Sequence, residues 1–303
     1  MHWRLPPFSF STQGSIILPL ETRPLHDSFG LEILNVDIRA IDDETVNAIE
    51  QAWISTPVLL IRNQLLSEAE QVEFSQRFGP TNLHVREDIR SRAHPEIVLI
   101  SNLRYESGAN VGALASGEAA WHMDSCYKTN PDTGCFLYAV EVPPAQGRTS
   151  WSNLQLAYES LRSELKSRIE GCRGEFAYQI YSVDTNTEEG LSDIRVRTPD
   201  VTHPIVLTAP ASLRKGLYLD PLQTFGIDGM PPEESGPILD ELKAAATQAD
   251  YVWEHTWERG DLVLWDNARV LHRREPFDER VPRLLKRTTV FLPPDKYPTP
   301  QSH

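Results

Sequence analysis

The length, composition and charge of the chain limit the classes of protein to which it can belong. With 303 residues, of which 40% are hydrophobic, it can form one large domain or two small ones around a sizeable core. Asp and Glu (43) outnumber Lys and Arg (29), and the net charge of -14 argues against a broad surface for nucleic acid or anionic membranes.

Three cysteines without a CxxC pair indicate free thiols in a reducing compartment. The N-terminus makes a poor signal peptide, and no stretch approaches the ~20 apolar residues of a membrane-spanning helix. We therefore expect a cytoplasmic protein.

The first part of the chain predicts alternating strands and helices. They follow in the order strand 29–38, helix 42–56, strand 57–63 and helix 66–79. The second helix begins with Ser67 as its N-cap, carries Glu70 at the capping-box position, and is expected to stop at Gly79.

From residue 96 onward most apolar runs are short and strand-like, separated by Pro and Gly. Helices are predicted for 154–171 and 232–249. Many short strands with few helices predict a jelly-roll type barrel with appended helices, in one domain without internal repeats.

Two polar or small-residue segments flank the candidate site regions described next. They are 104–120, rich in Gly, Ala and Ser, and 184–200, which has little periodicity. Each is either a lid over a site or a surface loop.

The stretch "WHMDSCY" (121–127) contains a candidate metal-binding pair. Successive side chains of a strand point to opposite faces, so His122 and Asp124 would project to the same side. A polar surface strand that binds nothing would show the same pattern. Cys126 could share this face and suggest a zinc thiolate, or pack as a buried thiol.

A third ligand is available in "GDLVLWDNARVLHRREPF", where His272 follows a predicted strand and turn. Two histidines and one carboxylate leave adjacent positions on a metal open, which suits non-haem Fe(II). Zinc hydrolases use the same ligand types, so the ligands alone do not name the metal.

Arg283 and Arg287 in "RVPRLLKRTTVFL" form a second candidate site. Their four-residue spacing puts both on one face of a strand. Two guanidiniums directed into a barrel would be costly unless they met anions, and an arginine fork could hold a keto-acid cosubstrate beside iron. The alternative is a salt-bridged surface strand.

Several of these motifs, in this order, resemble the taurine dioxygenase-like (TauD/TfdA) family of Fe(II)- and 2-oxoglutarate-dependent oxygenases. "WHMDSCY" is similar to its WHxD motif, "GDLVLWDNARVLH" to its WDNxxxxH segment, and "RVPRLLKR" to its terminal arginine motif. "PAQGRTSW" (144–151) is similar to its GGxT element.

The resemblance implies a mostly β fold with flanking helices, a double-stranded β-helix of the jelly-roll, cupin-like type. This domain would cover residues 24–292, with an N-terminal extension (1–23) and a C-terminal tail (293–303). By the same resemblance the iron ligands are His122, Asp124 and His272, and the residues that bind the 2-oxoglutarate C5 carboxylate are Thr149 and Arg283.

Two further positions are implied to contact the substrate. Arg287 matches a position that contacts an anionic group in the taurine enzymes, and His84 lies near a substrate-contacting histidine of relatives. For His84 the alternative is an exposed loop histidine. The taurine-binding members have an Asn shortly before WHxD, which "SGEAAWHMD" lacks, and this argues against taurine itself.

The resemblance implies Fe(II), 2-oxoglutarate and O2 as cofactor and cosubstrates. The expected reaction is hydroxylation of a C–H bond in a small, anionic substrate, with release of succinate and CO2. A desaturase acting on an amino-acid-derived substrate, such as an isonitrile, is the alternative within the family. Two alternatives from other classes of protein remain open, a non-catalytic jelly-roll binding protein and a zinc hydrolase. The oligomeric state is also open, and a homo-oligomer is possible.

Overall fold

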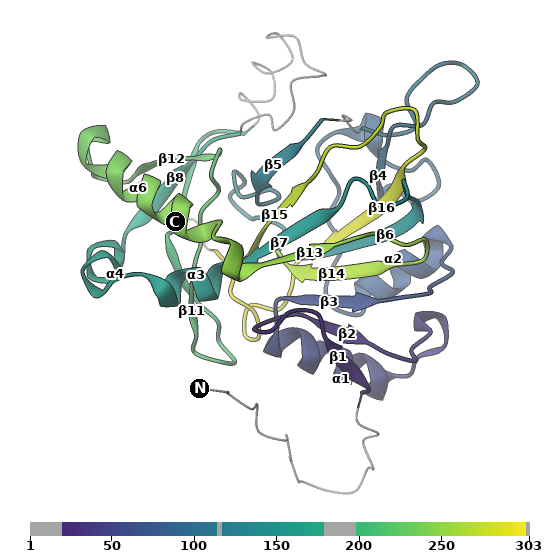
Figure 1. Ribbon diagram of the computed structural model, residues 1–303, viewed down its shortest axis with the longest axis horizontal. Coiled ribbons are helices and arrows are strands. Elements are labelled where there is room, and N and C mark those ends of the chain that lie inside the picture. Colours follow the sequence, from purple (N-terminus) through teal and green to yellow (C-terminus); the bar gives the residue numbers. More distant parts are fainter. Residues whose placement is uncertain (1–19, 114–116, 179–197, 301–303) are drawn as a thin grey trace, which may run out of the picture.

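Two β-sheets packed face to face form the centre of the computed structural model, which describes residues 20–113, 117–178 and 198–300 (Figure 1). The larger sheet has the strand order β1 (Thr22–Pro24), β2 (Leu31–Ile33), β3 (Val58–Ile61), β14 (Leu262–Asp266), β6 (Gly134–Glu141), β16 (Leu284–Val290), β4 (Val98–Ser101). The smaller sheet has the order β13 (Val252–His255), β7 (Thr149–Asn153), β15 (Val270–Arg274), β5 (Ala119–His122).

Within the described residues, every strand pair of these two sheets is antiparallel except β2 with β3. The predicted jelly roll with flanking helices is confirmed.

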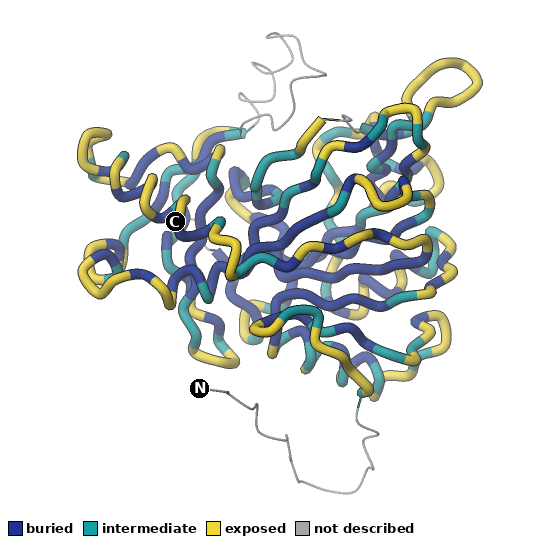
Figure 2. Tube along the Cα trace, viewed as in Figure 1, coloured by how far each residue is buried: buried dark blue, intermediate teal, exposed yellow. Residues whose placement is uncertain are grey.

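The larger sheet is covered on both faces, which explains the continuous apolar run in β3. Val58 and Leu60 belong to the core between the sheets, whereas Leu59 and Ile61 belong to the core beneath the N-terminal helices. Those helices are α1 (Asp43–Ser55) and α2 (Glu68–Gln76). The central strands are accordingly buried along most of their length (Figure 2).

A third core lies to one side of the sheets, under α3 (Leu154–Ser160), α4 (Ser163–Ile169) and α6 (Pro232–Ala246) (Figure 1). Its strands are β8 (Arg173–Phe176), β9 (Val201–Pro204) and β12 (Thr224–Ile227), with the hairpin of β10 (Val206–Thr208) and β11 (Lys215–Leu217). Short 3₁₀ helices lie at Ile38–Ala40, Glu87–Ile89 and Ala249–Tyr251.

The predicted helices 42–56 and 66–79 are confirmed, including the capping box of Ser67 and Glu70. The second helix ends at Gln76, and Gly79 serves a different purpose. A Cβ atom there would lie 2.1 Å from the Phe291 carbonyl oxygen, so a glycine lets the two chain segments approach.

Two predicted elements differ from those observed. The strand expected over 29–38 ends at Ile33, because the chain turns through Asn35, whose φ of 57° lies in the left-handed region. The helix expected over 154–171 is two helices, because Leu161 and Arg162 have extended backbones and the Leu161 side chain turns into the core.

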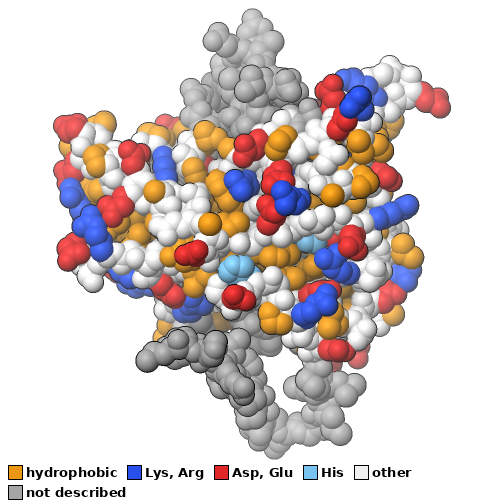
Figure 3. Space-filling model, in the orientation of Figure 1, with side chains coloured by type: hydrophobic (Ala, Val, Ile, Leu, Met, Phe, Trp, Pro, Cys, Tyr) orange, Lys and Arg blue, Asp and Glu red, His pale blue; other side chains and the backbone are white. Residues whose placement is uncertain are grey.

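The boundaries 24–292 stay a prediction, although Tyr297, beyond them, is 1% exposed and lies against Trp53 with ring centroids 5.7 Å apart. The two possible lids are described only in part. Residues 184–197 of the segment 184–200, and residues 114–116 of the segment 104–120, lie outside the described residues. None of the described helices is both long and apolar enough to span a membrane. On the face in Figure 3, basic side chains are interspersed with acidic ones and form no continuous basic patch.

Candidate active site

Three potential metal ligands converge beside the smaller sheet. His122 ends β5 and pairs with His272 on the neighbouring strand β15, and their ring centroids are 4.1 Å apart. Asp124 follows in the turn after β5, with Oδ2 3.6 Å from His272 Nε2. One ligand atom from each of the three residues lies within 4.8 Å of the other two. Strand pairing thus assembles the predicted triad.

The protonation states of the triad suit a cation. His122 Nδ1 lies 2.7 Å from the Ala120 carbonyl oxygen, which can only accept, so Nδ1 carries the hydrogen and Nε2 presents its lone pair. Burial, with a further effect of His122, lowers the pKa of His272 well below its usual range. Burial alone would raise the pKa of Asp124, but Arg287 and the two histidines lower it overall. Asp124 is therefore ionised.

The spacing of the triad also fits a shared metal ion. A distance of 3.6 Å between Asp124 and His272 is too long for a hydrogen bond. Two atoms that each lie about 2.1 Å from one ion can be separated by such a distance. Two imidazoles and one carboxylate that leave other positions open match the ligand set of non-haem Fe(II) oxygenases.

Asn267, buried in the turn between β14 and β15, holds the backbone of Asp124. Its Oδ1 accepts a hydrogen bond from Asp124 N–H at 3.2 Å, and its Nδ2 donates to the Asp124 carbonyl at 2.7 Å and the Asp132 carbonyl at 3.0 Å. Because the same turn leads into β15, Asn267 fixes Asp124 relative to the strand that carries His272.

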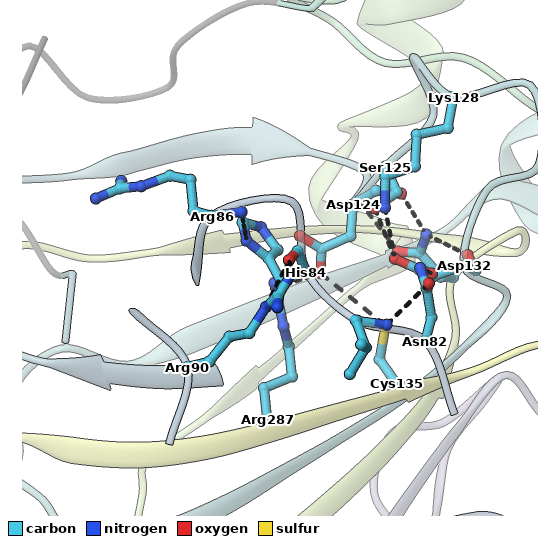
Figure 4. Close-up of polar contacts among 12 residues, drawn as sticks. Asn82, His84, Arg86, Arg90, Asp124, Ser125, Lys128, Asp132, Cys135 and Arg287 are labelled. Carbon is cyan, nitrogen blue, oxygen red and sulfur yellow. Dashed lines mark hydrogen bonds and ion pairs between the residues drawn. The ribbon is translucent and has the colours of Figure 1, made fainter. Parts of the chain in front are cut away.

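Two buried carboxylates hold the chain on either side of Asp124. Asp220 Oδ2 accepts a hydrogen bond from Met123 N–H at 2.7 Å. Asp132 accepts one from the Ser125 hydroxyl at 2.6 Å and also contacts the Asn82 amide (Figure 4). The contact to Ser125 supports its left-handed φ of 59°. The backbone around the metal-binding motif is thus fixed by side chains from three other segments.

Arg283, just before β16 of the larger sheet, contacts the chain two residues before Thr149, which begins β7 of the smaller sheet. Arg283 is 2% exposed, its NH2 donates to the Gly147 carbonyl at 3.3 Å, and its buried Nε has no partner among the described residues. Burial lowers the pKa of Arg283 to about 9, and the charge of Arg274 contributes. The Thr149 hydroxyl accepts from Trp257 Nε1 at 2.8 Å, which leaves its hydrogen for another acceptor. This arrangement favours a bound anion.

Arg287 joins the larger sheet to the metal-binding triad. It lies on β16, and its NH1 donates to Asp124 Oδ2 at 2.6 Å. Its Nε is buried without a partner in the described part of the chain. The alternative of a salt-bridged surface strand for Arg283 and Arg287 is wrong, because both guanidiniums point into the molecule.

His84 lies beside Arg287 and Asp124 (Figure 4). It is half-buried, so the expectation of an exposed loop histidine is wrong. Burial, together with Arg287 and Lys128, lowers the pKa of His84 to about 4, so the ring is neutral near pH 7. His84 Nδ1 accepts from Arg86 N–H at 3.1 Å, so the hydrogen is on Nε2, which can donate.

Cys126 does not belong to the metal-binding group. It is fully buried, and burial together with Asp220 and Asp124 raises the pKa of its thiol well above the usual range. A neutral thiol is a poor ligand for zinc, so the thiolate alternative loses its basis.

The jelly-roll fold, the group of two histidines and one carboxylate, and the buried arginine beside it define the class of non-haem metal oxygenases that use a keto-acid cosubstrate. Comparison with known proteins gives the family. The chain matches the family described as "Taurine catabolism dioxygenase TauD, TfdA family" over residues 21–289.

Individual relatives agree with this match. The chain is 32% identical to the alpha-ketoglutarate-dependent 2,4-dichlorophenoxyacetate dioxygenase of Cupriavidus pinatubonensis over 88% of this chain and 96% of that protein. The crystal structure of a taurine dioxygenase from Burkholderia xenovorans is similar with a TM-score of 0.76, at 28% identity, over 94% of this chain and 95% of that one. The crystal structure of AAD-2 in complex with Mn(II) and N-oxalylglycine is similar with a TM-score of 0.73, at 26% identity, over 90% of this chain and 98% of that one.

This chain belongs to the TauD/TfdA family. It is an Fe(II)- and 2-oxoglutarate-dependent dioxygenase, alpha-ketoglutarate being another name for 2-oxoglutarate.

Two residues that support the site, Asn267 and Asp220, are not among the predicted site residues. Asn267 lies within the WDN segment, beside the predicted ligand His272, and this position is the signal that could have identified it.

Proposed function

We propose that this dioxygenase hydroxylates a C–H bond of a small substrate that carries a carboxylate or another anionic group, with release of succinate and CO2. The observation that carries the proposal is the position of Arg287, an arginine whose side chain is only 13% exposed and which contacts Asp124 directly. An anion at Arg287 would place the rest of a small molecule next to the triad.

We assign the Fe(II) to His122, Asp124 and His272, and the far carboxylate of 2-oxoglutarate to Thr149 and Arg283. Bound iron and 2-oxoglutarate supply the activation of O2 and the oxidation of the C–H bond. The protein residues bind and orient. Arg283 and the Thr149 hydroxyl hold one end of the cosubstrate by charge-assisted hydrogen bonds in a site that excludes water.

We assign substrate contacts to Arg287 and His84. Arg287 donates to Asp124 with NH1, and its Nε, which has no partner among the described residues, supports a second acceptor from the substrate. His84 is a neutral donor through Nε2, so it can contact a substrate oxygen without adding a charge. The relative named above acts on 2,4-dichlorophenoxyacetate, a carboxylate, which favours an anionic substrate over an isonitrile of a desaturase.

We also propose that the protein acts in the cytoplasm and binds neither nucleic acid nor membranes, which its net charge of -14 and its free thiols support. A homo-oligomer is compatible with these assignments, and light scattering would determine its size.

The test is oxygen uptake and succinate release by the purified protein with Fe(II), ascorbate and 2-oxoglutarate, over a panel of carboxylates, sulfonates, sulfate esters and amino acids. We expect slow succinate release without substrate and stimulation by one anionic class. A matched His272→Ala protein should release none. Stimulation by uncharged compounds alone would contradict the proposed substrate class.

A further inference from the structure

We propose that Arg274 is a second arginine of the cosubstrate site and makes it selective for a 2-oxo acid with a second carboxylate. The proposal rests on the proposed roles of Arg283 and Thr149. In this role Arg274 attracts the second carboxylate of the cosubstrate by its positive charge, without donating a hydrogen bond to it.

The first observation is the place of Arg274 on β15. Arg274 is two residues after His272, so both side chains project from the same face of the strand. The separation along the strand is about 6.6 Å at 3.3 Å per residue. Arg274 also pairs directly with Thr149 on β7. A five-carbon diacid with one end beside His272 would thus bring its other end level with Arg274 and Thr149.

The second observation is that Arg274 and Arg283 share one aromatic ring. Their guanidinium carbons lie 5.1 and 5.6 Å from the centroid of Phe277. Arg274 is 8% exposed and Arg283 is 2% exposed. Two like charges held close together and away from water repel each other, and a bound carboxylate would relieve this repulsion.

The neighbouring carboxylates are engaged elsewhere. Glu275, the next residue, accepts from Arg148 Nε at 2.7 Å and NH2 at 2.9 Å, and Glu254 also pairs with Arg148. Glu118, whose charge acts on Arg274, is exposed to solvent, which screens it. Among the described residues, the positive charges of Arg274 and Arg283 therefore outweigh the negative charge of nearby carboxylates at this end of the site.

The contacts of Arg274 fix its direction. Its NH1 donates to the Glu275 carbonyl at 2.8 Å and its NH2 to the Gly117 carbonyl at 2.5 Å. Carbonyl oxygens hold the guanidinium in place without neutralising it, because they carry only partial charge. Arg274 therefore contributes an oriented charge, while Arg283 and Thr149 supply the nearer donors.

The test compares the affinities of 2-oxoglutarate and pyruvate for the Mn(II)-loaded protein by calorimetry, so that no turnover is needed. Pyruvate has the same chelating end and lacks the second carboxylate. We expect Arg274→Gln to weaken 2-oxoglutarate binding about tenfold, as for loss of one charge in a buried polar site, and to leave pyruvate binding unchanged. Arg274→Lys should retain an intermediate affinity.

The matched control is Arg273→Gln. Arg273 points to the opposite face of β15, over the ring of Trp121 at 4.9 Å, and its replacement removes the same charge one residue away. We expect no change in the ratio of the two affinities. Thermal unfolding of each variant verifies that it is folded.

Two results would overturn the proposal. Unchanged 2-oxoglutarate affinity in Arg274→Gln and Arg274→Lys would show that the charge plays no part, and an equal loss for both ligands would show a structural role. Failure of the proposed function is a separate result, since the wild-type protein would then bind neither acid in the presence of Mn(II).

Discussion

Asp124 is the residue on which the electrostatics of the site depend. It contacts Arg287 at 2.6 Å and lies 3.6 Å from His272. The HxD spacing offers Asp124 as a candidate ligand and the resemblance to the family selects it, although Asp124 lies in the turn after β5 and not in a strand. Its contact with Arg287 joins a turn of one sheet to a strand of the other, and no local pattern encodes a pair 163 residues apart.

Replacing Arg287 with Gln should therefore change two properties. Loss of the charge-assisted hydrogen bond to Asp124 should lower Mn(II) affinity about tenfold, the usual effect of removing a partner of a metal ligand. Substrate KM should rise and succinate formed per substrate oxidised should increase, while 2-oxoglutarate affinity stays nearly the same. Calorimetry and product analysis measure these effects.

Arg283→Gln is the matched comparison, because Arg283 lies four residues before Arg287, next to the start of β16. It should weaken 2-oxoglutarate binding by about 2 to 5 kcal/mol, because a buried carboxylate loses its ionic partner, and leave Mn(II) affinity intact. If the two variants showed the same pattern of losses, Arg283 and Arg287 would not have the separate roles assigned to them.

His84 should make the stability of the metal-free protein depend on pH. Its pKa in the folded protein is about 4, against 6.5 for the ordinary side chain, so the unfolded chain binds more protons between these values. Stability should consequently fall as pH drops from about 6.5 to about 4. Urea unfolding of His84→Gln should show a shallower fall, and an identical pH profile to wild type would show that His84 is not buried at the site.

At the scale of elements, turns and close approaches position the site. The capping box and the apolar periodicity predict α1 and α2 because these signals are local. The break at Leu161 and the clamp of Asn267 on Asp124 depend on contacts with distant segments, which sequence periodicity does not contain.

Asn267→Ala should lower Mn(II) affinity by about 10- to 100-fold, because the Asp124 backbone loses one donor and one acceptor that fix it against β15. Asn267→Asp keeps an acceptor for Asp124 N–H but loses the donor to the Asp124 carbonyl. It should therefore lower Mn(II) affinity measurably, but less than Asn267→Ala does. Calorimetry measures both. If Asn267→Ala bound Mn(II) as tightly as the wild-type protein, Asn267 would not position Asp124.

Gly79→Ala should destabilise the fold by about 1 to 3 kcal/mol, because a new Cβ would meet the Phe291 carbonyl oxygen at 2.1 Å. Gly236→Ala is the matched control in α6, where a Cβ would meet nothing within 4 Å. It should stabilise by up to about 1 kcal/mol through helix propensity. Urea unfolding distinguishes them, and equal effects would contradict the close approach at Gly79.

At the scale of the whole molecule, the jelly roll was predictable because many short strands with Pro and Gly punctuation suit few other architectures. The separate core under α3 and α6 was not, since its strands and helices show the same local patterns as those of the main sheets. The site lies between elements that only the complete fold brings together: β5 and β15 from the smaller sheet and β16 from the larger.

Because the ligands come together only in the folded chain, metal binding should stabilise the whole molecule. A ligand that binds only the native state at 100 times its Kd adds about 2.7 kcal/mol to the free energy of unfolding. Mn(II) should therefore raise the Tm of the wild-type protein measured without oxygen turnover, and 2-oxoglutarate should raise it further only when Mn(II) is present, since the cosubstrate uses both the metal and Arg283. His272→Ala should lose both increases in Tm, because it lacks one of the three ligands. It should still fold without metal, because the buried His272 ring is neutral and no ion pair is lost with it. A rise in Tm of His272→Ala equal to that of wild type would place the metal elsewhere.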